Sequence, residues 1–156
     1  MPESRLVPEL QPMDDRLLSM IASQRQGVLA TIATDGRPQL SNVLYVWDAA
    51  ERVARISTTA DRVKARNVRR DPRAALHVSG RHFWQYVVGE GIVTVSGVAA
   101  EPGDEAGREL LALHTVHYGQ LDEDEFYPAM IAARRLVVRL HVHRVYGIAL
   151  DNPPGT

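Results

Sequence analysis

Alternating apolar and polar residues run through much of this chain and predict a protein built mainly from β-strands. The clearest case is LVVRLHVHRVYGIAL, where Val138, Leu140 and Val142 alternate with arginine and histidine. A period of two places the apolar side chains on one face of a strand. VLATIA, QLSNVLYVWD, ERVARIST and AALHVS are predicted as further strands. WQYVVGEGIVTVSGVAA is one long strand or two, because its glycines favour a bend or bulge.

Other segments have the longer spacing of helices. DDRLLSMIASQRQG begins with acidic residues, carries Leu17, Leu18 and Ile21 on one face, and has Gly27 as its expected C-terminal cap. ADRVKARNVRRDP is predicted as a short helix that Pro72 closes, and DEAGRELLALHTVHYG and DEDEFYPAMIAARR as two more. About six strands with turn-linked antiparallel neighbours predict a mainly β (α+β) fold, an antiparallel β-barrel with peripheral helices over its openings.

The length favours one domain, because 156 residues bury about two-thirds of their unfolded surface around a single core. Pro2, Pro8 and Pro12 make the first dozen residues a poor helix or strand. We expect an N-terminal arm over 1–13, a barrel domain over 14–150 and a tail over 151–156. No apolar run approaches the ~20 residues of a membrane span. MPESRLVPEL has no apolar segment of the secretory type, so a cytoplasmic location without a membrane partner is expected.

Charge is distributed unevenly along the chain. The net charge is −1 and the pI is near 6.6, which argues against a general attraction to nucleic acid. The stretch STTADRVKARNVRRDPR nevertheless holds six of the 18 basic residues, including Lys64, the only lysine. There is no cysteine, so disulfides, thiolate catalysis and zinc–thiolate sites are excluded. The local basic patch therefore needs a local explanation.

The predicted basic helix has two different faces at about 100° per residue. Its outward sector carries Arg62, Arg66, Arg69 and Arg70, and Lys64, Asn67 and Val68 point towards the barrel. The hydroxyls of STT and the free N–H groups of a helix start suit an anion. Two interpretations stay open at this point. One is a solvated charged face with Lys64 reaching water, and the other is a phosphate site formed by Ser57, Thr58, Arg62, Lys64 and Asn67.

Other candidate residues are also open to two interpretations. Gln39, Ser41 and Asn42 are solvent-facing strand residues or ligand contacts, and on a regular strand they cannot all reach one ligand. Trp84 is a half-buried strand tryptophan or a ligand contact. The pairs His114/His117 and His141/His143 lack the spacing and carboxylate of a known zinc motif, so we expect surface or interface histidines and no metal.

The order of three segments resembles a known superfamily. GVLATIATDGRPQLSNVLYVWD, RISTTADRVKARNVRRDPRAALHV and FWQYVVGEGIVTVSG are similar to the split β-barrel flavin/deazaflavin oxidoreductases, the superfamily of the pyridoxamine phosphate oxidases. The resemblance is greatest to the actinobacterial branch that uses the deazaflavin coenzyme F420, and it covers most of residues 14–148. It implies a six-stranded antiparallel split β-barrel that forms a homodimer with two cofactor sites at the subunit interface.

The resemblance also implies roles for single residues. Lys64 matches the family's phosphate-contacting lysine, and the arginines beside it can meet the acidic oligoglutamate tail of F420. Gln39 and Asn42 match positions that touch the deazaflavin ring or its linker. Trp84 matches an aromatic residue that reaches across the dimer towards the partner's cofactor.

The sequence therefore predicts an F420-dependent oxidoreductase that transfers hydride from reduced deazaflavin to a small conjugated organic substrate. No catalytic side chain is identified, because the protein would supply binding, orientation and a partly dry pocket. Flavin mononucleotide is the close alternative, in an enzyme like pyridoxamine phosphate oxidase. A second alternative is a non-catalytic protein that binds flavin, F420 or haem. A nucleic-acid-binding role is disfavoured by the neutral pI and by the lack of a recognition-helix pattern.

Overall fold

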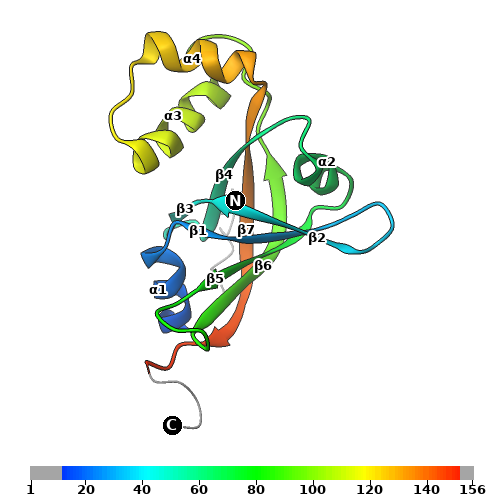
Figure 1. Cartoon of the computed structure of the whole chain (residues 1–156), viewed down its shortest axis with the longest axis vertical. Helices are drawn as coiled ribbons and strands as arrows, with labels where there is room; N and C mark the ends of the chain where they lie inside the picture. The colour runs from blue at the N-terminus through cyan, green and yellow to red at the C-terminus, as the bar shows by residue number, and fades with distance from the viewer. Residues whose placement is uncertain (1–11, 152–156) are drawn as a thin grey trace, which may run out of the picture.

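Seven strands form one antiparallel sheet in the computed structural model, which describes residues 12–151 (Figure 1). The order across the sheet is β2-β1-β5-β6-β7-β4-β3. The strands are β1 (Gln26–Ile32), β2 (Pro38–Leu44), β3 (Val46–Asp48), β4 (Val53–Thr59), β5 (Arg73–Ser79), β6 (Tyr86–Val95) and β7 (Arg135–Ile148). The mainly β split barrel is confirmed, with seven strands where about six were expected. The predicted N-terminal arm and C-terminal tail lie almost entirely outside the described residues.

The additional strand arises at Tyr45, where the segment predicted as one strand divides into β2 and β3. The Tyr45 ring is fully buried, and its hydroxyl donates a hydrogen bond to the carbonyl of Ile21 at 2.6 Å. β2 pairs with β1, and β3 pairs with β4. Consecutive strands thus occupy opposite edges of the sheet, which requires the sheet to curl into a barrel.

β6 and β7 are the longest paired strands, and β7 runs from the end where α4 lies to the opposite end of the sheet (Figure 1). Their register shifts between Glu90 and Gly91, so the GEG segment is a bulge within one strand. This agrees with the prediction of one long strand and not with that of two. A side chain at Gly91 would collide with the carbonyl of His141. The bulge therefore depends on glycine at this position.

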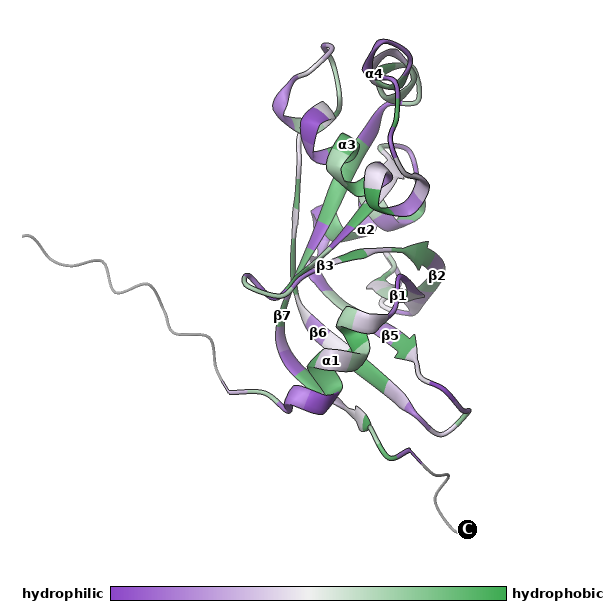
Figure 2. Ribbon diagram, turned by 90° about the vertical axis from the view of Figure 1, so that its left-hand side faces the viewer, coloured by the Kyte–Doolittle hydropathy of each residue, from purple (hydrophilic) through white to green (hydrophobic). Residues whose placement is uncertain are grey.

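Within the described residues, four helices lie around the sheet, and they are α1 (Asp15–Ser23), α2 (Val63–Arg70), α3 (Glu105–Tyr118) and α4 (Glu123–Ala132). α3 and α4 cover one end of the molecule, and α1 lies beside the sheet nearer the other end (Figures 1 and 2). The expected cap at Gly27 is wrong, because α1 ends at Ser23 and Gly27 is part of β1. A Cβ at Gly27 would lie 2.6 Å from the carbonyl oxygen of His77, so the glycine allows β1 and β5 to approach closely.

The core has two parts, which β7 connects. Inside the barrel, apolar side chains from α1, α2 and the strands pack together, including Leu29, Tyr45, Ile56, Val68 and Leu140. A smaller cluster under α3 and α4 consists of Ala99, Leu110, Leu113, Phe126, Met130 and Val137. None of the described helices is long and apolar enough to cross a membrane.

Candidate functional site

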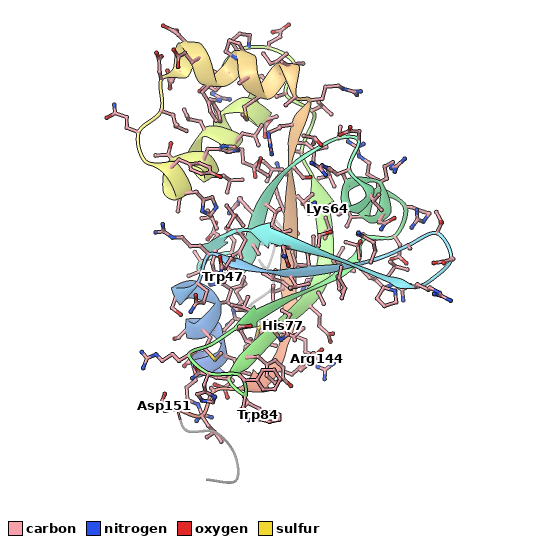
Figure 3. The ribbon with its side chains drawn as sticks, viewed as in Figure 1. Trp47, Lys64, His77, Trp84, Arg144 and Asp151 are labelled. Carbon is pink, nitrogen blue, oxygen red and sulfur yellow. The ribbon has the colours of Figure 1, made fainter. Side chains whose placement is uncertain are left out.

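The basic helix α2 is fastened to the barrel through its buried face. Ala65, Asn67 and Val68 are buried there, and the Asn67 amide donates to Thr31 Oγ1 of β1 at 3.1 Å. The helix begins at Val63, later than residue 60, where the predicted helix starts. Lys64 is half-buried on the side that faces the barrel (Figure 3). The two faces predicted for this helix are therefore confirmed.

The arginines of α2 form the exposed face, as predicted, but they are not equivalent. Arg70 donates to the carbonyl of Ile32 at 2.6 Å and to Asn67 Oδ1 at 3.2 Å, so it helps to attach the helix to β1. Arg62, Arg66 and Arg69 are exposed, and their side chains make no hydrogen bond or ion pair within the described part of the chain. These three guanidinium groups can reach a ligand without first breaking a contact.

A cavity of about 210 Å³ lies between β2, β4, α2 and α3. The side chains that line it come from distant parts of the sequence, because β4, β7 and α3 lie next to one another there. Its lining consists of Asn42, Val43, Leu44, Arg55, Ile56, Ser57, Lys64, Leu113, His114, His117, Tyr118 and Arg135. A cavity of this size suits one small polar group better than a whole cofactor.

The Ser57 hydroxyl is the central polar group of this cavity. Arg135 Nη1 donates to Ser57 Oγ at 3.1 Å. His114 Nε2 lies 3.0 Å from the same oxygen. Because β4 pairs with β7, the backbone holds Ser57 and Arg135 close together. His114 comes from the neighbouring helix α3. The three side chains therefore form one hydrogen-bonded group.

Two cationic side chains of the cavity, Lys64 and Arg135, have no carboxylate partner among the described residues. Burial, followed by repulsion from Arg62 and Arg135, lowers the pKa of Lys64 from its ordinary value. Within residues 12–151, Lys64 and Arg135 make no ion pair with an acidic side chain. Partly buried cations without partners are unfavourable, and an anionic ligand would relieve the cost. This property makes the cavity a candidate anion site.

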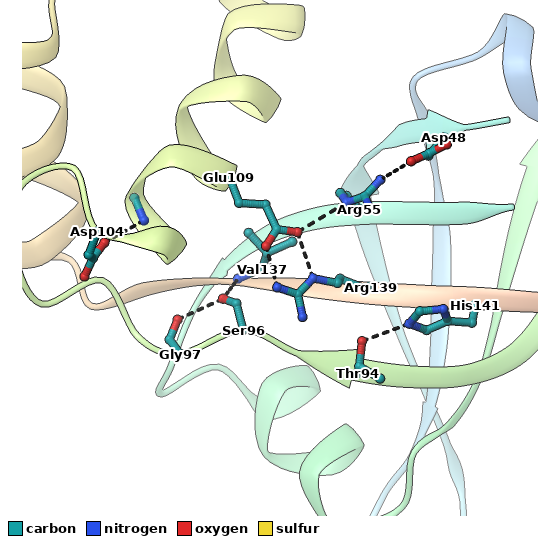
Figure 4. A network of polar contacts seen from close by, with 11 residues as sticks. Asp48, Arg55, Thr94, Ser96, Gly97, Asp104, Glu109, Val137, Arg139 and His141 are labelled. Atoms are coloured by element: carbon teal, nitrogen blue, oxygen red, sulfur yellow. Dashed lines mark hydrogen bonds and ion pairs between the residues drawn. The ribbon is translucent and has the colours of Figure 1, made fainter. Parts of the chain in front are cut away.

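Arg55 lines the same cavity, but its charge is already balanced. It forms ion pairs with Asp48 at 2.9 Å and with Glu109 at 3.2 Å, and Glu109 also pairs with Arg139 (Figure 4). This network joins α3 to β4 and β7, so it holds the helix that carries His114 in place. Of the three cations that line the cavity, Arg55 thus has carboxylate partners, whereas Lys64 and Arg135 have none among the described residues.

Both histidines of the cavity favour the neutral form. Burial, followed by the charges of Arg135 and His117, lowers the pKa of His114. Burial and the charge of Arg25 lower the pKa of His117. A neutral imidazole has one nitrogen that donates and one that accepts, so His114 can act towards Ser57 in either sense.

Three of the residues predicted for the site meet at the cavity, namely Asn42, Ser57 and Lys64. Gln39 and Ser41 lie on the other face of β2, where Gln39 Oε1 accepts from Ser41 Oγ at 3.5 Å. This division follows from the alternation of side chains along a strand.

The other predicted residues lie outside the cavity lining. Thr58 is buried next to Ser57, again because neighbouring strand residues point to opposite faces. Asn67 is buried and bonded as described above. Arg62 stands at the exposed start of α2. Trp84 is 51% exposed and packs edge-on against Phe83, and it lies near the lower end of the molecule in Figure 3, well away from Lys64.

Sequence reasoning missed Arg135, His114 and His117 as members of the site. No local pattern marks them, because Arg135 is an ordinary residue at the start of a strand and the two histidines look like surface positions of a helix. Pairing of β4 with β7 and the position of α3 bring them to Ser57. In the described part of the chain, no cluster of three or more histidine, aspartate or glutamate side chains could hold a metal ion.

The fold and the cavity define a split-barrel protein with a concave, positively charged site. Comparison with known families agrees, since the model described as "Pyridoxamine 5'-phosphate oxidase" matches residues 13–149. The chain belongs to this family of flavin-binding split barrels. The resemblance seen in the sequence is therefore confirmed at the level of the superfamily.

Solved structures have a similar fold. The conserved protein Rv2991 of Mycobacterium tuberculosis is 24% identical, with a TM-score of 0.65 over 96% of this chain and 94% of that one. An F420 reductase is 26% identical, with a TM-score of 0.61 over 82% of this chain and 94% of that one. A heme binding protein from Mycobacterium smegmatis is 20% identical, with a TM-score of 0.61 over 92% and 57% of the two chains. The first and third likenesses, both below 25% identity, show the fold alone.

Proposed function

We propose that this protein is an F420-dependent oxidoreductase acting on a small conjugated organic substrate. The observation that carries the proposal is the pair Lys64 and Arg135, which face one cavity beside Ser57 without an acidic partner among the described residues. When bound, the reduced deazaflavin supplies a hydride from ring carbon 5. The residues of this chain bind and orient the cofactor and limit the access of water.

The donor set fits the phosphate of such a cofactor. Lys64 offers a compact ammonium, Arg135 a guanidinium and Ser57 a hydroxyl, and charge-assisted hydrogen bonds of these kinds are the strong ones for a phosphate. Asn42 lines the same cavity and would contact the adjoining part of the cofactor. Gln39, Ser41, Thr58 and Asn67 would support the site from β2, β4 and α2.

The exposed arginines favour F420 over flavin mononucleotide. Flavin mononucleotide ends at its phosphate, whereas F420 continues through lactate into a chain of glutamates. Arg62, Arg66 and Arg69 are exposed and unpaired within the described residues, so they offer contacts that only the longer cofactor would use. The likeness to an F420 reductase at 26% identity supports the same choice.

A homodimer is part of this proposal. Phe83 is 85% exposed and packs against Trp84, which is 51% exposed and lies far from Lys64 of its own chain (Figure 3). Large exposed aromatic side chains mark surfaces that contact a partner. We propose that Trp84 approaches the cofactor of the second subunit.

Titration of the purified apoprotein tests the proposal directly. Absorbance is followed while F420 and flavin mononucleotide are added separately, and we expect saturable binding with F420 the tighter ligand. A second assay follows the oxidation of reduced F420 in the presence of quinones, tetrapyrroles or unsaturated ketones. Binding without turnover of any of these would favour a carrier protein, and absence of binding by both cofactors would refute the proposal.

A further inference from the structure

The Ser57 hydroxyl has one hydrogen and two close neighbours. Arg135 Nη1 can only donate, so its contact at 3.1 Å uses the Ser57 oxygen as an acceptor. His114 Nε2 lies 3.0 Å away and takes either role. If this nitrogen is unprotonated, Ser57 donates its hydrogen to His114. The hydroxyl then has no hydrogen to offer to a ligand in the cavity.

An anion in the cavity changes this arrangement. An anion only accepts hydrogen bonds, so the Ser57 hydroxyl can serve it only by turning its hydrogen towards it. The contact between Ser57 and His114 then persists only if Nε2 carries a hydrogen. A neutral ring can supply this hydrogen by moving it from Nδ1, but an anion beside the ring favours the form with a hydrogen on both nitrogens, in which His114 is a cation.

We propose that His114 is a positioning residue that releases the Ser57 hydroxyl to an anion in the cavity and takes up one proton from solvent in doing so. No covalent bond changes: the proton joins Nε2, and the Ser57 hydrogen turns from Nε2 to the anion. This inference rests on the proposed function in one respect, since it treats the cavity as the anion site. It adds a proton-coupled residue from α3 to that site.

The surroundings of His114 explain why the proton is absent before the anion arrives. The charged and titratable groups of the cavity around it are Arg135 of β7, Lys64 of α2, Arg55 of β4 and His117 and Tyr118 of α3, and α4 contributes the ring of Phe126. Arg135, Lys64 and Arg55 are cationic, and among residues 12–151 carboxylates neutralise Arg55 alone. Burial and the charges of Arg135 and His117 lower the pKa of the His114 ring. A bound anion opposes this repulsion and raises that pKa.

Sulfate is the appropriate probe, because its charge stays constant over the range in which histidine titrates. We expect the sulfate Kd of the wild-type protein to fall about fivefold or more between about pH 8 and pH 5. Nitrogen NMR of the histidine rings should show that His114 carries a hydrogen on both ring nitrogens when sulfate is saturating. His114→Gln keeps a side chain that can donate to Ser57 but cannot take up a proton. Its sulfate Kd should vary less with pH than that of the wild type, with only the contribution of His117 left.

His117→Gln is the matched control, because His117 lines the same cavity one turn along α3 without a contact to Ser57. This variant should keep most of the pH dependence of the wild type. The proposal is overturned if His114→Gln retains that dependence, or if sulfate leaves the His114 ring nitrogens of the wild type unchanged. The cofactor titrations are read separately: proton-coupled sulfate binding without binding of F420 or flavin mononucleotide would refute only the proposed function.

Discussion

The side-chain amide of Asn67 donates a hydrogen bond to the hydroxyl of Thr31 at 3.1 Å, and this contact fastens α2 to β1. Asn67 is only 3% exposed, and its carbonyl oxygen also accepts from Arg70. The orientation of the basic helix, and with it the direction in which Lys64 points, therefore depends on a buried pair of polar groups.

We expect Asn67→Ala to lower the free energy of unfolding by about 1–3 kcal/mol, because it leaves the buried Thr31 hydroxyl without its donor. Urea denaturation followed by circular dichroism measures the change. Arg66→Ala on the exposed face of the same helix is the control and should stay within about 0.5 kcal/mol. Equal stability of the two variants would show that Asn67 does not anchor the helix.

Removal of the Lys64 ammonium should weaken cofactor binding. We expect Lys64→Ala to cost about 1.5–3 kcal/mol of binding free energy for F420, as for a charge-assisted hydrogen bond, with little effect on folding. Absorbance or fluorescence titration gives the two dissociation constants. An unchanged affinity would show that the Lys64 ammonium does not contact the cofactor and is solvated instead.

The same lysine should carry a pH-dependent cost in stability. Because the pKa of Lys64 is lowered in the folded chain, the unfolded chain binds more protons, and stability rises with pH between the lowered pKa and the ordinary value of about 10.4. Lys64→Met removes the buried charge, so it should be more stable than the wild type at neutral pH. This advantage should disappear as the pH rises through that window. The free energy of unfolding of both proteins is measured as a function of pH. If the variant stays more stable than the wild type at high pH, the charge of Lys64 is not the cause of the difference.

Salt should distinguish the two cofactors. Exposed arginine contacts to a glutamate tail are worth ~0.2–1 kcal/mol each and are screened by salt. F420 should therefore bind more tightly than flavin mononucleotide at low salt, and added salt should narrow the difference. Neutralising Arg62 and Arg66 together to glutamine should have the same effect, with a smaller fall in flavin affinity. If salt weakens both ligands equally, the arginines do not bind a tail.

The oligomeric state tests the role of Trp84. We expect sedimentation to show a dimer at micromolar protein concentration, with the exposed Phe83 and Trp84 at or near the interface. Trp84→Ala should weaken cofactor binding although the residue is remote from the cavity of its own chain. A stable monomer with full cofactor affinity would refute both the dimer and the shared site.

The periodicity of the chain was sufficient to predict most of the fold. Alternation identified the strands, the spacing of arginines separated the outer face of α2 from Lys64, and GEG indicated the bulge in β6. The sequence predicted strand boundaries less well. One predicted strand divides into two at Tyr45, whose hydroxyl donates to the carbonyl of Ile21, a residue far away in the sequence. Gly27 was misread for a similar reason, since its need for glycine comes from the approach of β5.

The sequence by itself determined the class of fold and the presence of a basic segment, and it made Lys64 the leading candidate for contact with an anion. These properties are local, because helix and strand periods and a cluster of like charges can be read from neighbouring residues. Only the tertiary structure decided which groups surround that lysine. Arg135 and His114 reach Ser57 because β4 pairs with β7 and α3 packs over them. Such contacts join residues far apart in the chain, and no local pattern encodes the pairing that brings them together.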